Sequence, residues 1–66
     1  MQITVNGNNT GIEPKMNIRQ YLGTRQIDLA GVVVEINQKI IKKQEWEITE
    51  LKDGDIVELI SFVGGG

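Results

Sequence analysis

The chain has 66 residues, enough for one small domain whose stability has to come from packing a modest core. It contains neither cysteine nor histidine, which excludes disulfides, thiolate catalysis and zinc–thiolate sites, and which removes the usual general base at neutral pH. A formal net charge of −2 does not favour nucleic-acid binding, and no apolar run is long enough to span a membrane.

Residues branched at Cβ dominate the apolar composition. Ile and Val together number sixteen, against four Leu and a single Ala. Such side chains favour strands, and the scarcity of Leu and Ala disfavours a helical bundle. Because the sequence shows no secretory signal, we expect a cytoplasmic, soluble, mostly β domain with one helix.

The first segment predicts a β-hairpin. Residues 3–5 alternate apolar and polar side chains and run into Asn6-Gly7, a dipeptide suited to a type I′ turn. The returning strand is predicted over about residues 10–13. Its Ile12 should point to the same side as the apolar residues of the first strand.

A helix is predicted to begin after Asn17. Asn17 can cap it, Gln20 stands at the capping-box position, and Met16 and Tyr21 occupy the positions of a hydrophobic staple. We expect the helix to pass through Gly23 and to end about three residues later. The apolar residues at helical spacing, which should face the core, are Ile18, Tyr21 and Leu22.

Two further strands are predicted after Gly31. Residues 32–36 have a period-two pattern in which the first, third and fifth side chains point inward. Ile40-Ile41 is long enough only for a small edge strand. The basic residues around it, which suit the protection of an exposed strand edge, are Lys39, Lys42 and Lys43.

A polar stretch then leads to the last strand. Its apolar anchors are predicted to be Trp46, Ile48 and Leu51. A lone tryptophan could stack on a ligand, but a half-buried anchor for a long loop is the favoured interpretation. Asp53-Gly54 predicts a second turn; a metal site that includes Asp55 is disfavoured because no further carboxylate follows at suitable spacing.

The last strand is predicted over residues 56–63. Val57 and Leu59 should point toward the helix, which leaves Glu58, Ile60 and Phe62 facing solvent. Two large apolar side chains on an open face suggest a contact surface. A register slip of one residue would instead place both in the core.

The order of these elements predicts an α+β fold. A hairpin, a helix, a strand, a short strand and a final strand describe a mixed sheet of four to five strands with one helix packed across it. No glycine-rich loop that could cradle phosphates precedes the helix, so we do not expect this chain to bind ATP by itself. An independent enzyme is therefore not expected.

The three closing glycines allow two interpretations. They could be a disordered terminus or a cloning remnant. Alternatively, three extended glycines reach roughly 10 Å beyond the last strand. Without Cβ atoms they could thread a narrow channel and deliver the terminal carboxylate to a partner's active site.

Three segments together resemble one known family. They are "MQITVNG", "VVVEINQKII" followed by Trp46, and "LKDGDIVELISFVGGG". Over its whole length the chain resembles the ThiS family, the sulfur carrier proteins of thiamine biosynthesis, which have the ubiquitin-like β-grasp fold. The resemblance implies a β-grasp domain of residues 1–63 and a flexible glycine tail of residues 64–66.

The resemblance also implies a reaction at the chain end. A ThiF-like adenylyltransferase would use ATP to adenylate Gly66, and sulfur from a cysteine desulfurase would displace AMP and leave a thiocarboxylate. A ThiG-like thiazole synthase would take that sulfur. Gly64 and Gly65 would thread the partner's active site, with Gly65 as the required neighbour and Gly64 as spacer. We expect the partner contacts to be Ile60, Phe62 and Val63.

Other interpretations stay open at this point. The small subunit of molybdopterin synthase shares the fold and the chemistry, but those chains are usually longer and have a different aromatic first strand. A ubiquitin-like modifier would share the tail and conjugate to lysines. A plain β-grasp interaction module fits if the glycines are an artefact. In the sulfur-carrier interpretation the chain alone is a monomer that binds no cofactor, nucleic acid or membrane.

Overall fold

The computed structural model describes residues 1–62. The elements in chain order are β1 (Gln2–Val5), β2 (Asn8–Gly11), α1 (Ile18–Thr24), the 3₁₀ helix η1 (Leu29–Gly31), β3 (Val32–Ile36), β4 (Lys39–Ile41), the 3₁₀ helix η2 (Lys43–Glu45) and β5 (Ile56–Ser61). None of the helices in this part of the chain is long and apolar enough to cross a membrane.

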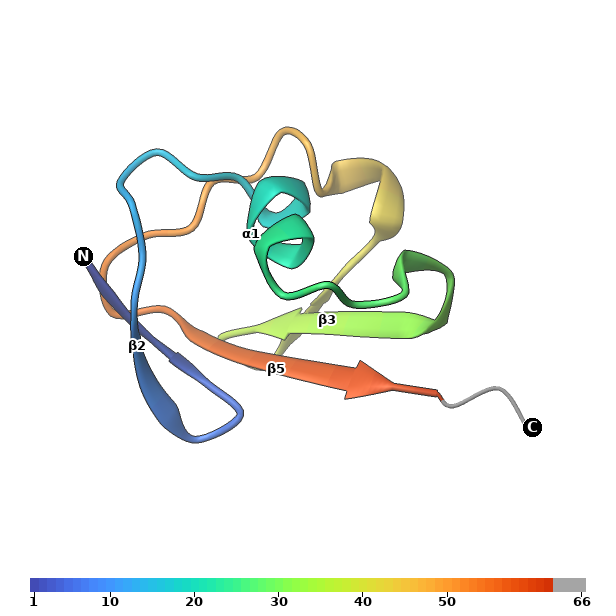
Figure 1. Cartoon of the computed structure of the whole chain (residues 1–66), viewed down its shortest axis with the longest axis horizontal. Coiled ribbons are helices and arrows are strands. Elements are labelled where there is room, and N and C mark those ends of the chain that lie inside the picture. Colours follow the sequence, from blue (N-terminus) through green and yellow to red (C-terminus); the bar gives the residue numbers. More distant parts are fainter. Residues whose placement is uncertain (63–66) are drawn as a thin grey trace.

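The strands form one five-stranded mixed sheet in the order β2-β1-β5-β3-β4. Strand β5 is central and runs parallel to its neighbour β1, and every other neighbouring pair runs antiparallel. Helix α1 lies across one face of this sheet (Figure 1). The predicted β-grasp architecture, a mixed sheet with a single α-helix, is confirmed.

The hairpin turns where the sequence predicts. Asn6 and Gly7 have φ angles of 49° and 84°, both positive, as a type I′ turn requires. A two-residue turn sets Asn8 directly opposite Val5, so β2 begins at Asn8. The predicted bounds of residues 10–13 were therefore wrong, although Ile12 does pack against the core.

The predicted capping box starts α1. The Asn17 side chain accepts the Gln20 N–H at 2.8 Å, and the Gln20 side chain accepts the Asn17 N–H at 2.9 Å. Gly23 lies inside the helix, as predicted, but α1 ends at Thr24, earlier than expected. Gln26 stops it, because its φ of 56° is left-handed.

The core lies between α1 and the sheet. Its buried apolar side chains are Ile3, Val5, Ile18, Tyr21, Leu22, Val32, Val34, Ile36, Trp46, Leu51, Val57 and Leu59. The set contains the inward-facing residues predicted for α1, for β3 and for the last strand. It also contains two of the three anchors predicted for the polar stretch, Trp46 and Leu51, and lacks the third.

The third predicted anchor is Ile48. Trp46 is buried more completely than predicted, with 2% of its surface exposed, and its indole Nε1–H donates to the Ile41 carbonyl at 3.1 Å. Ile48 is 81% exposed, so its prediction as an anchor was wrong. The tight turn that continues from η2, in which the Ile48 N–H bonds to the Glu45 carbonyl, carries this side chain away from the core.

Candidate functional site

The last strand, β5, is held in the middle of the sheet. Beyond the end of β1, the Asn6 side chain continues the pairing: its Oδ1 accepts the Leu59 N–H at 2.8 Å, and its Nδ2 donates to the Leu59 carbonyl at 3.3 Å. One amide thus satisfies both backbone groups of a buried strand residue. The sequence analysis assigned Asn6 only to the turn and missed this role, which no local pattern reveals.

Gly31 brings the end of η1 against the end of β5. The Phe62 N–H donates to the Gly31 carbonyl at 2.7 Å, and a Cβ on Gly31 would lie 3.0 Å from the Phe62 carbonyl oxygen. A side chain at this position would therefore press on the backbone that leads to the glycine tail. The sequence analysis identified Gly31 as a separator and missed this close approach.

One face of the sheet, opposite α1, exposes several large apolar side chains. We call this set the apolar face; its members are Ile40 (65% exposed), Ile56 (53%), Ile60 (44%) and Phe62 (64%). The predicted exposure of Ile60 and Phe62 is confirmed, which excludes the one-residue register slip. Ile40 and Ile56 were missed, although counting back by twos from Phe62 reaches Ile56.

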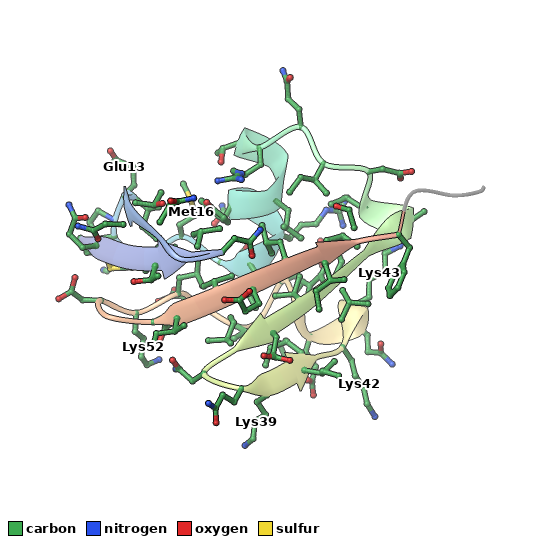
Figure 2. The ribbon with its side chains drawn as sticks, turned by 90° about the horizontal axis from the view of Figure 1, so that it is seen from below. Glu13, Met16, Lys39, Lys42, Lys43 and Lys52 are labelled. Carbon is green, nitrogen blue, oxygen red and sulfur yellow. The ribbon has the colours of Figure 1, made fainter. Side chains whose placement is uncertain are left out.

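Two carboxylates stand within the apolar face. Glu35 and Glu58 are directly opposite each other on β3 and β5. Among residues 1–62 the one ion pair joins Arg19 to Glu47, so neither Glu35 nor Glu58 is ion-paired with a basic side chain. Figure 2 looks onto this side of the molecule and shows Lys39 and Lys42 projecting outward on the β4 side. The apolar face is therefore suited to a partner surface that combines apolar groups with a cation.

The carboxylates of the second turn bind backbone N–H groups, one in β1 and one in the turn itself. The Asp53 carboxylate accepts the Gln2 N–H at 2.8 Å, and the Asp55 carboxylate accepts the Lys52 N–H at 2.8 Å. Gly54 has a φ of 89°, which confirms the predicted turn. In the described part of the chain no three carboxylate, histidine or cysteine side chains are grouped as metal ligands.

The predicted reactive positions lie outside the described residues. They are the acceptor Gly66, the threading residues Gly64 and Gly65, and the contact residue Val63. The predicted last strand also included residue 63, whereas β5 ends at Ser61 within the described range. The roles of these residues stay predictions, and the structure describes the chain as far as Phe62.

Two known proteins have sequences similar to that of this chain. The chain is 41% identical over 49 residues to the sulfur carrier protein ThiS of Bacillus subtilis (strain 168), a match that covers 74% of each protein. It is 32% identical over 66 residues to a thiazole synthase of Paramagnetospirillum magneticum (strain ATCC 700264 / AMB-1). The chain spans only 20% of the length of that synthase.

Solved structures resemble the chain over its whole length. A crystal structure of the thiamine biosynthesis protein ThiS from Geobacter metallireducens has a TM-score of 0.86 at 32% identity, with all of both chains covered. A solution structure of a thiamine biosynthesis protein from the same organism has a TM-score of 0.82 at 33% identity, covering 100% of this chain and 88% of that one. The ThiS family model matches residues 3–66, and the chain therefore belongs to the ThiS family.

Proposed function

We propose that this protein is a sulfur carrier of thiamine biosynthesis. The observation that carries the proposal is the ThiS family match over residues 3–66, which includes the three closing glycines. The ThiS relative in Bacillus subtilis supports it over three quarters of its length. The same match favours thiamine biosynthesis over the molybdopterin synthase and protein-modifier alternatives.

The proposed chemistry takes place on the carboxylate of Gly66. A carboxylate is a poor electrophile until it carries a leaving group, so a ThiF-like adenylyltransferase first joins it to AMP from ATP and releases pyrophosphate. The outer sulfur of a persulfide that a cysteine desulfurase has loaded then attacks this adenylate, and AMP departs. A further thiol of the partner reduces the resulting acyl disulfide, which leaves a thiocarboxylate on Gly66 and a disulfide on the partner. In this scheme the carrier is a co-substrate, and the catalytic groups and the ATP site belong to its cytoplasmic partner enzymes.

The apolar face supplies the proposed contact with the adenylyltransferase. Ile60 lies on β5, Phe62 follows the end of that strand, and Val63 is the next contact we propose. Docking on these residues would bring the tail to the partner, where Gly64 and Gly65 would thread a channel too narrow for side chains. The thiazole synthase relative, part of which resembles this chain, supports a ThiG-like synthase as the sulfur acceptor.

The adenylation step can be tested by pyrophosphate exchange. The monomeric carrier, incubated with the adenylyltransferase, ATP and labelled pyrophosphate, should support exchange of label into ATP. Deletion of Gly65 and Gly66 shortens the reach by roughly 7 Å and should abolish it. Addition of one residue after Gly66 should be as damaging. Equal exchange with the truncated chain would overturn the proposal, because the carboxylate position would then be irrelevant.

A further inference from the structure

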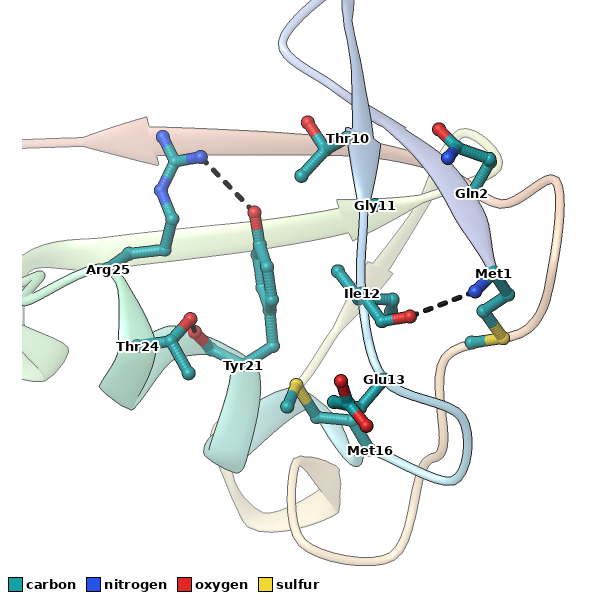
Figure 3. A pocket seen from close by; sticks show the side chains of 10 residues that line it. All are labelled: Met1, Gln2, Thr10, Gly11, Ile12, Glu13, Met16, Tyr21, Thr24 and Arg25. Carbon is teal, nitrogen blue, oxygen red and sulfur yellow. Dashed lines mark hydrogen bonds between the residues drawn. The ribbon is translucent and has the colours of Figure 1, made fainter.

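A groove lies between β2 and α1, on the helix side of the sheet and therefore away from the apolar face (Figure 3). Its volume is about 480 Å³. The lining residues that the following argument uses are Thr10, Ile12, Glu13, Met16, Tyr21 and Arg25. None of the partner contacts proposed above lines this groove.

One end of the groove presents hydrogen-bond donors without an acceptor. Arg25 Nη1 donates to the Tyr21 hydroxyl at 3.2 Å, and the guanidinium lies 6.0 Å from the centre of the Tyr21 ring. Tyr21 is only 3% exposed, yet its own hydroxyl proton has no acceptor among residues 1–62. No carboxylate in this range pairs with Arg25. A guanidinium beside a hydroxyl donor matches the hydrogen-bonding needs of a carboxylate.

The side of the groove is the free edge of the sheet. The Ile12 N–H donates to the Met1 carbonyl, and the Met1 amino group donates to the Ile12 carbonyl. In an antiparallel pair every second residue bonds to the neighbouring strand, so this pair fixes which residues of β2 bond to β1. Asn9 and Gly11 therefore turn their N–H and C=O groups away from β1. Strand β2 is the outermost strand, so these backbone groups point out of the sheet. They can pair with a further strand.

The groove is also polarised along its length. Ile12 and Met16, both packed against the core, give it an apolar floor. Arg25 lies at one end and Glu13 at the other, as Figure 3 shows. An occupant that complements these charges has a carboxylate at one end, apolar side chains in the middle and a cation at the opposite end.

We propose that this groove binds an extended peptide segment of a partner protein, which adds as a sixth strand to the free edge of β2. The backbone of the peptide pairs with Asn9 and Gly11. Its alternate side chains enter the groove: an acidic one contacts Arg25 and Tyr21, and apolar ones cover Ile12 and Met16. Because the groove and the apolar face are on opposite sides of the sheet, this partner can bind while the tail is in use.

A designed peptide tests the proposal. The probe has acetylated and amidated ends and the sequence Asp-Thr-Val-Thr-Val-Thr-Lys, so that Asp, both Val and Lys lie on one face of a strand. It is titrated into the ¹⁵N-labelled full chain, and amide shifts are followed by NMR. Saturable shifts should appear at Asn9, Gly11 and Arg25, with none at Ile60. Absence of saturable shifts on β2 and α1 would overturn the proposal.

Three changes identify the contacts. Arg25→Gln should weaken binding about threefold to tenfold, whereas Arg19→Gln, which removes the same charge from the first turn of α1 outside the groove, should not. Replacing the peptide Asp by Asn should weaken binding to the native chain by a similar factor, and it should not weaken binding to the Arg25→Gln variant any further. Undiminished binding by Arg25→Gln, or a full additional loss with the Asn peptide, would contradict the carboxylate contact.

Gly11→Pro tests the strand addition separately. Proline removes an N–H that β1 does not use, and the nearest atom to a Cβ at Gly11 is the flexible Gln2 side-chain amide at 3.5 Å. A folded Gly11→Pro chain should lose most of its affinity for the peptide. Native affinity in that folded variant would overturn pairing at the β2 edge, and the Arg25→Gln comparison decides the proposal if the variant does not fold.

Discussion

At the scale of single residues, two glycines in this fold have opposite surroundings. Gly31 lies so close to the end of β5 that a Cβ would be 3.0 Å from the Phe62 carbonyl oxygen. That backbone cannot easily retreat, because the Phe62 N–H is bonded to the Gly31 carbonyl at 2.7 Å. Gly23 lies inside α1, and a Cβ there would meet nothing within 4 Å.

Alanine substitutions at these two glycines should therefore change the free energy of unfolding in opposite directions. Gly31→Ala should lower the free energy of unfolding by about 1–2 kcal/mol, because the added methyl group forces a backbone shift. Gly23→Ala should raise it by about 0.5–1 kcal/mol, because alanine is the better helix residue. Urea unfolding of both variants measures the effects. A gain in stability from Gly31→Ala would show that the close approach is not tight.

Phe62 is the residue of the apolar face that we expect to matter most for docking. Phe62→Asp should weaken binding to the adenylyltransferase about tenfold or more, because buried aromatic side chains dominate interfaces. The free energy of unfolding of this variant should differ from that of the native chain by less than about 0.5 kcal/mol, since Phe62 is 64% exposed. Calorimetric titration measures the affinity.

The matched control is Ile48→Asp, which changes an equally apolar, exposed residue outside the apolar face. It should leave both affinity and stability unchanged. If Phe62→Asp unfolds the protein while its folded fraction binds normally, then Phe62 stabilises the domain and does not contact the partner.

At the scale of elements, the pairing of β3 with β5 combines good packing with an electrostatic cost. The inward residues of both strands are buried in the core. On the other face the same register sets Glu35 against Glu58. Like charges directly opposite each other on neighbouring strands are destabilising. The free protein therefore keeps a repulsion that a cation on a docked partner would relieve.

A double-mutant cycle measures this repulsion. Glu35→Gln and Glu58→Gln should each raise the free energy of unfolding by roughly 0.2–1 kcal/mol at low salt. The double variant should gain about as much as either single variant, because one substitution already removes the repulsion. Thermal unfolding at low and high salt checks both points, since salt should shrink the gains. Additive gains that do not depend on salt would contradict the interaction.

Most elements could be predicted because their signals are local. The Asn17 capping box and the alternation in residues 32–36 are each complete within a few residues, and the structure confirms both. The start of β2 was misplaced because the two-residue turn, and not the apolar content, decides which residues pair. Ile48 was misassigned because apolar spacing has no fixed period in an irregular loop.

The surroundings of the candidate site were less predictable. The period-two pattern of the last strand predicted that Ile60 and Phe62 are exposed, and the structure confirms this. The Asn6 amide bonds to Leu59, 53 residues away, and the backbone of Gly31 bonds to that of Phe62, which is also distant in the sequence. Such contacts depend on strand order and register, which no short segment specifies.

At the scale of the whole molecule, the sheet separates two surfaces. The apolar face lies on the side opposite α1 and includes Phe62, the last residue described, and the groove between β2 and α1 lies on the helix side. Between them, the buried side chains of residues 1–62 are almost entirely apolar. This arrangement suits a carrier that presents a chain end and docking surfaces, with the reactive chemistry supplied by its partners.

The most direct test of that account is the mass of the intact protein after incubation with the adenylyltransferase, ATP and a sulfur source. The native chain should gain the mass of one oxygen-to-sulfur exchange, and fragmentation should locate the sulfur on Gly66. The chain without Gly65 and Gly66 should keep its mass. An unmodified native chain, or sulfur on any internal residue, would contradict the sulfur-carrier function.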